Sequence, residues 1–134
     1  MMFKEIQDLT VSKLTGATAA GSKVFNSPFI LPESREAPFI KVYITDASAE
    51  NLANVPALYF DVKVQIELVT IEYSTADQIC GEVLSLLLND SEWVGQFKRV
   101  RSATVQHGLY PFGDDPLMQS FIVIDAGIYV AYEQ

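Results

Sequence analysis

The sequence predicts an α+β fold in which a mainly antiparallel, mixed sheet carries two helices packed on one face. Residues 57–69 alternate apolar and polar side chains, which is the pattern of a strand with one buried face. Residues 75–88 repeat apolar side chains at i, i+3, i+4 and i+7, which is the pattern of an amphipathic helix. The elements run in the order helix, strands, helix, hairpin, and a single domain over residues 1–134 accommodates all of them.

The N-terminal part begins with a short amphipathic helix predicted at residues 3–15, and Gly16 is its expected stop. A brief strand is expected at 23–26. Residues 27–38 contain three prolines among charged side chains, so this stretch is expected to form an exposed loop.

Two strands are expected next, at 39–45 and 57–69, each with one apolar face and one face in solvent. Residues 46–56 between them are small and polar without periodicity, so they are expected to form a loop. The side chains expected on the solvent faces are Lys41, Tyr43, Thr45, Tyr59, Asp61, Lys63, Gln65 and Glu67.

The helix at 75–88 has Ser74 as its expected N-cap, with Asp77 three residues further on as in a capping box. It is expected to end near Asn89. The residues expected to cover the edge of the core after it are Trp93, Val94 and Phe97.

Two further strands, at 98–109 and 118–132, are expected to form a hairpin around a turn-rich tip, with a bulge possible at Gly127. Strand length carries a functional hint. The strand at 57–69 would reach ~40 Å at about 3.3 Å per residue, whereas a compact chain of this size has a diameter of roughly 36 Å. Strands that overrun the body expose edges that invite pairing, so a homo-oligomer is expected, with a strongly curled monomeric sheet as the alternative.

The formal net charge of -8 argues against tight binding of nucleic acid, which normally needs a basic surface. The basic cluster Lys98, Arg99 and Arg101 is interpreted as the solvated entrance of a strand. The start of the chain lacks the apolar core of a signal peptide, and no apolar run approaches the ~20 residues of a membrane span. Synthesis in the cytoplasm without a membrane contact is therefore expected.

The sequence shows no clear catalytic apparatus, so no enzyme activity and no cofactor are expected. Cys80 is the single cysteine and lies on the apolar stripe of its helix, which indicates a buried side chain. His107 is the single histidine, so a zinc site of the Cys/His type cannot form. Asp114 and Asp115 could bind a hard cation, but an exposed acidic turn explains the pair more simply.

With these elements in order, the chain resembles the minor tail protein U family, the tail terminators of lambda-type long-tailed phages. The likeness covers residues 3–134 and rests on an ordered set of stretches, none of them specific alone. They are Ala37-Pro38-Phe39-Ile40-Lys41-Val42-Tyr43-Ile44-Thr45, the alternating body Phe60 to Leu68, the helix led by Asp77, Gly108-Leu109-Tyr110 with the acidic loop after it, and Ile128-Tyr129-Val130-Ala131-Tyr132-Glu133. Pro111, Phe112 and Gly113 stand where the family pattern has arginines.

The resemblance implies a structural role in the virion tail, with assembly in the host cytoplasm. Such proteins form rings, typically hexamers, that cap the major tail tube protein, stop its polymerisation and present a surface to the head completion protein. An acidic lumen would let DNA pass without binding. Alternatives are a head-tail joining or other neck protein of the same fold, or a small-molecule-binding domain or enzyme that uses His107 with Asp114 or Asp115.

Candidate contact residues follow from this reading. The loops carrying Asp46 and Glu50, and Asp114 and Asp115, are expected to meet the tube or the head. Lys63 and Arg101, on solvent-facing strand positions, are expected to pair with acidic residues of a neighbouring subunit.

Overall fold

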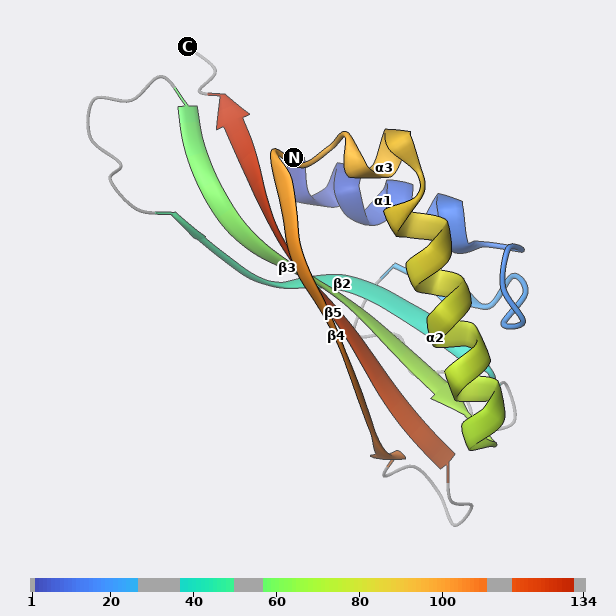
Figure 1. Ribbon diagram of the computed structural model, residues 1–134. Helices are drawn as coiled ribbons and strands as arrows, with labels where there is room; N and C mark the ends of the chain where they lie inside the picture. The colour runs from blue at the N-terminus through green and yellow to red at the C-terminus, as the bar shows by residue number, and fades with distance from the viewer. Residues whose placement is uncertain (1, 27–36, 50–56, 111–116, 132–134) are drawn as a thin grey trace.

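The computed structural model describes residues 2–26, 37–49, 57–110 and 117–131, and in these residues a five-stranded sheet carries three helices on one face (Figure 1). The helices are α1 (Met2–Leu14), α2 (Tyr73–Leu88) and the short α3 (Ser91–Val94). The strands are β1 (Val24–Phe25), β2 (Phe39–Ala49), β3 (Ala57–Thr70), β4 (Arg99–Tyr110) and β5 (Leu117–Ala131).

The spatial order of the strands is β1-β2-β3-β5-β4. All neighbours are antiparallel except β1, which pairs parallel with β2 over two residues. The predicted α+β fold, with a mainly antiparallel mixed sheet and its helices on one face, is therefore confirmed, and α3 is an addition to it. Of the predicted loops at 27–38 and 46–56, residues 27–36 and 50–56 lie outside the described residues, and so do residues 111–116 of the predicted hairpin tip.

The core lies between the helices and one face of the sheet, called here the helix face. Packing of α1 is mainly on β2, and packing of α2 is on β3 and β5. From Phe60 to Leu68, the even-numbered apolar positions of β3 point into this core, as the period-two pattern predicts, and so do those of β5. Trp93 of α3 is fully buried against Phe97, which confirms their predicted place at the core edge. None of the described helices is long and apolar enough to span a lipid bilayer.

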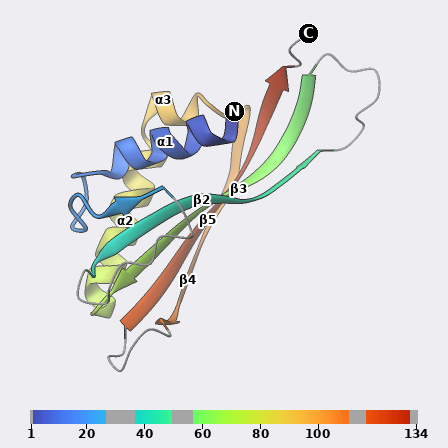
Figure 2. The same ribbon diagram turned by 180° about the vertical axis from the view of Figure 1, so that it is seen from behind.

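The two central strands are longer than the layer of helices that covers them. With 14 residues in β3 and 15 in β5, these strands reach about 46–50 Å at ~3.3 Å per residue. Their upper ends, with the end of β2, extend beyond the helices as a projection that both views show (Figures 1 and 2). This projection, called the arm, comprises residues 46–49, 57–61 and 127–131, and at its base Phe60 and Ile128 still pack in the core, Phe60 against Phe3 of α1.

The prediction of a loop beginning at residue 46 is wrong for its first four residues. Asp46 to Ala49 continue β2 and pair with Lys63 to Phe60 of β3, after a register shift between Ile44 and Asp46. The small polar side chains gave no alternating pattern because this end of β2 is exposed on both faces, so burial does not constrain it.

The face of the sheet opposite the helices is not uniformly in solvent, as the sequence pattern suggested. Lys41 and Glu67 are buried there and form an ion pair with an Nζ–Oε2 distance of 2.6 Å. A second, smaller apolar cluster on the same face surrounds Phe39 and Val69, and includes Ala37, Leu117 and Phe25.

Two local predictions are also corrected. Helix α2 begins at Tyr73 with Glu72 at the N-cap position and no side-chain cap, so Ser74 lies inside the helix. Strand β5 passes through Gly127 without a register shift against β3, and the irregularity lies instead on β4, between Val100 and Ser102.

Candidate assembly surfaces

A cluster of aromatic and charged side chains lies at the base of the arm, on the face opposite the helices. Arg101 stands at the irregularity of β4, and its side chain crosses β5 to reach β3. Its Nη2 donates a hydrogen bond of 2.7 Å to the Tyr59 hydroxyl and forms an ion pair with Asp61. The predicted interface residue Arg101 is therefore already paired within its own chain.

The Tyr59 side chain of this cluster lies directly over Gly127 of β5. A Cβ added there would overlap the hydroxyl and ring of Tyr59, so only glycine leaves room for this side chain to lie against β5. Tyr59 packs edge-to-face on Tyr129 with ring centroids 5.2 Å apart, and Lys98 Nζ lies 6.0 Å from the Tyr129 centroid. Because Tyr129 remains 55% exposed, the cluster presents an aromatic and cationic surface to solvent.

Lys63 and Asp46, both predicted as contact residues, are brought together by strand pairing. They are opposite each other on β2 and β3, and Asp125 of β5 faces Lys63 from the other side. Lys63 is exposed, and no ion pair joins it to another of the described residues. Glu50, Asp114 and Asp115, the other predicted contact residues, lie outside the described residues.

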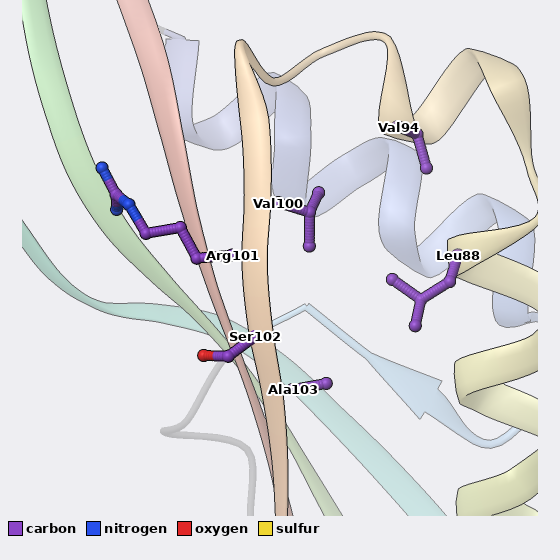
Figure 3. Close-up of a pocket in the computed structure, with 6 residues that line it drawn as sticks. All are labelled: Leu88, Val94, Val100, Arg101, Ser102 and Ala103. Carbon is purple, nitrogen blue, oxygen red and sulfur yellow. The ribbon is translucent and has the colours of Figure 1, made fainter.

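An apolar groove separates β4 from the helices. A hollow of about 300 Å³ is lined by Leu88, Val94, Val100, Arg101, Ser102 and Ala103. Figure 3 shows Leu88 and Val94 pointing from α2 and α3 towards Val100 and Ala103 of β4. Neither α1 nor α2 packs extensively on β4, so most of this strand is exposed, and Leu109 reaches 79%.

Among the residues that the structure describes, His107, Ser120 and Cys80 do not form an accessible reaction centre. His107 Nδ1 lies 2.6 Å from Ser120 Oγ across the β4–β5 pair, and Tyr73 packs edge-to-face on the imidazole. Ser120 is fully buried, so its hydroxyl cannot meet a substrate as a nucleophile. Burial, with a smaller effect of Asp77, raises the pKa of the Cys80 thiol to about 11, which keeps it a neutral core side chain.

Metal binding finds no support in the described parts of the chain, where no three His, Cys, Asp or Glu side chains are placed to hold an ion. The alternative in which His107 works with Asp114 or Asp115 concerns two aspartates outside the described residues.

In comparisons with known proteins, no protein-family model and no curated protein matches this chain.

Sequence reasoning missed Tyr59, Tyr129 and Gly127 as members of one surface. A signal for part of it exists, because Tyr59 and Asp61 stand at i and i+2 on one strand and so share a face. The approach of Arg101 could not be predicted, because it depends on the pairing order β3-β5-β4 and on the irregularity in β4.

Proposed function

We propose that this protein is a structural ring-forming component of a phage tail, a tail terminator that caps the tube and stops its polymerisation. Copies of the chain form a closed ring, hexameric if it follows the family that the sequence resembles. One ring face binds the last ring of the major tail tube protein, and the other provides the surface for the head completion protein.

The observation that carries this proposal is the arm together with the exposed strand β4. Monomeric proteins suppress long, uncovered strand edges because such edges invite pairing with other chains. Here the arm extends past the helices, and β4 keeps its outer edge and much of its helix face free within the described residues. Surfaces of this kind are expected in a subunit that is completed by its neighbours.

Charge is compatible with passage of DNA through such a ring. The formal net charge of -8 is spread over a small chain, and three of its nine basic residues, Lys98, Arg99 and Arg101, stand within four positions. Lys98 and Arg101 are both held by contacts within the chain. A ring with an acidic lumen would repel the phosphates and avoid tight binding.

The chemistry of the described residues supports a structural role better than an enzymatic one. The Ser120 hydroxyl next to His107 is buried, and the Cys80 thiol is buried with a raised pKa. An accessible nucleophile with a base beside it is the usual requirement for covalent catalysis.

The test combines purified protein with tubes polymerised from the major tail tube protein of the same phage. Negative-stain micrographs should show rings, free or on tube ends, and tubes grown in the presence of the protein should be shorter and capped. A protein that stays monomeric at every concentration and leaves tube length unchanged would contradict the proposal. Binding to head–tail connectors without binding to tubes would instead favour a neck protein.

A further inference from the structure

The sheet has two free edges within the described residues. On one side, β4 lies at the end of the strand order and pairs only with β5. On the other side, β1 covers β2 only opposite Ile40 and Lys41. No strand covers the outer edge from Val42 to Ala49, where the Ile44 N–H donates a long hydrogen bond of 3.4 Å to the Gln7 side chain of α1.

Both edges carry few of the charges that usually protect a strand from pairing, and those of β4 stand at its start, at Arg99 and Arg101. From Ser102 to Tyr110, β4 contains no Lys, Arg, Asp or Glu, and the free segment of β2 contains one charge, Asp46. Natural proteins commonly place lysines, prolines or inward-pointing charges on exposed edges to prevent association. Two long edges with so few of these residues are suited to pairing with another chain.

The two edges also match in direction and position. Neighbouring strands alternate in direction across β2, β3, β5 and β4, so β2 and β4 run in opposite directions. If a second copy is rotated about an axis parallel to the strands, its β2 therefore runs antiparallel to β4 of the first copy. The two edges also lie at the same height in the sheet, as a row of paired residues shows. Ile44 of β2 pairs with Val64 of β3, Val64 pairs with Ile124 of β5, and Ile124 pairs with Ala103 of β4. Residues 42–48 thus lie level with the first half of β4, and neighbouring copies need no large shift along the strands.

The helix layer points to the same arrangement. The groove beside β4 is uncovered because α2 packs on β3 and β5, whereas α1 packs mainly on β2. A second copy that added its β2 to β4 would bring its α1 to the helix face beside Val100 and Ala103. In such a contact, both the sheet and the layer of helices continue from one copy into the next.

Charge distribution favours contact between unlike edges over contact between two copies of β4. Arg99 is exposed at the beginning of β4, and Asp46 and Glu5 are exposed on the β2 side. Arg99 of β4 and Ser48 of β2 stand in the same row of paired residues, which runs between them through Gly127 of β5 and Asp61 of β3. This places Arg99 diagonally across from Asp46 of the other copy on the same face, a distance at which opposite charges attract.

We infer that the outer edge of β4 and its groove receive the β2 edge of a second copy, antiparallel and head to tail. Such a contact joins two different surfaces, and a contact of this kind generates a ring when the rotation between neighbours closes on itself. The inference rests on the proposed ring-forming function and specifies which surfaces build the ring.

Cysteine cross-linking distinguishes this contact from others. Ala47 on β2 and Ala103 on β4 are both exposed, and Cys80 is buried with a raised thiol pKa, so it will not compete for reagent. A bismaleimide added to rings of the Ala47→Cys/Ala103→Cys variant should give covalent dimers, trimers and longer species. Each single variant should remain monomeric on a denaturing gel.

The outcomes separate the inference from the proposed function. Rings that are visible in micrographs but give no cross-linked species in the double variant would overturn the inference and leave the function intact. Dimers formed by the Ala103→Cys variant alone would also overturn it, because they indicate contact between two copies of β4. Absence of rings both in solution and on tube ends would overturn the proposed function first.

A substitution pair provides an independent check. Ala103→Glu places a charge in the groove, whereas Ala19→Glu makes the same change at an exposed turn after α1. The first variant should lose ring formation at concentrations where the wild type and the second variant form rings, with an unchanged melting temperature. Normal rings from a folded Ala103→Glu variant would contradict the inference.

Discussion

The indole Nε1–H of Trp93 donates a hydrogen bond of 2.8 Å to the hydroxyl of Thr10, and both side chains are fully buried. The Thr10 hydroxyl in turn donates to the Ile6 carbonyl at 2.7 Å. This link joins the first helix to the short α3, 83 positions apart in the sequence. It holds the helix layer together at the point where β4 begins.

Thr10→Val should therefore destabilise the protein by about 1–3 kcal/mol, because the Trp93 N–H remains buried without an acceptor while the side-chain volume hardly changes. Urea unfolding followed by tryptophan fluorescence measures the difference. Thr15→Val is a matched control, since the Thr15 hydroxyl makes the same bond to a carbonyl four residues earlier but is exposed. The control should stay within about 0.5 kcal/mol of the wild type, and equal losses in both variants would contradict the role of the Trp93 bond.

The buried ion pair on the opposite face provides a second prediction. Lys41→Met should destabilise the fold by about 3–5 kcal/mol, because Glu67 would keep a buried charge with Gln119 as its one hydrogen-bond donor among the described residues. Adding Glu67→Gln removes that charge and should recover a large part of the loss at pH 7. If the double variant is no more stable than Lys41→Met, the uncompensated charge is not the cause.

Gly127 provides a test of the cluster at the arm. Gly127→Ala should displace the Tyr59 ring and separate its hydroxyl from Arg101, with a destabilisation of about 1–3 kcal/mol from overpacking. Gly108→Ala is the control, because a Cβ at that strand position meets nothing within 4 Å. A crystal structure of the Gly127→Ala variant with Tyr59 in place would disprove the predicted displacement.

Asp90 gives a prediction for the pH dependence of stability. Its carboxylate accepts the Trp93 backbone N–H at the start of α3 and pairs with Lys13, and these contacts, led by the backbone bond, lower its pKa. Protonation therefore favours the unfolded chain. The stabilisation is present above the unfolded pKa of about 3.9 and is lost as pH falls through the lower folded value.

Asp90→Asn keeps the capping oxygen and removes the charge. Melting temperatures from pH 7 to pH 3 should show the wild type more stable at neutral pH, with the difference shrinking as the pH falls. A difference that stays constant over the whole range would show that the charge of Asp90 is not responsible.

The sequence pattern predicted most of the fold because burial on one face controls it. Val62, Val64 and Ile66 alternate with polar residues, and Ile79 and Val83 follow a helical repeat, so each element has one face against the common core. The long strands were predicted for the same reason. Their length led to the expectation of an assembly surface.

The remaining features depend on contacts between distant strands. Nothing local distinguishes buried Lys41 and Glu67 from exposed Lys63, because all three stand on the same side of their strands. Their burial follows from the pairing of Lys41 with Glu67 and from the apolar cluster around Phe39 beside them. The position of Arg101 was likewise hidden, because its irregular pairing leaves no pattern in a single strand.

The central position of β5 has a consequence for biosynthesis. Its residues join β3 on one side and β4 on the other, yet they follow both strands in the sequence. Until the residues of β5 have left the ribosome, β4 has no neighbour in the sheet of its own chain. The β4 edge that we propose as a contact surface is therefore not yet formed. Under the proposed assembly, a second copy can therefore be recruited at β4 only after the last strand of the sheet has been synthesised and has paired with β3 and β4.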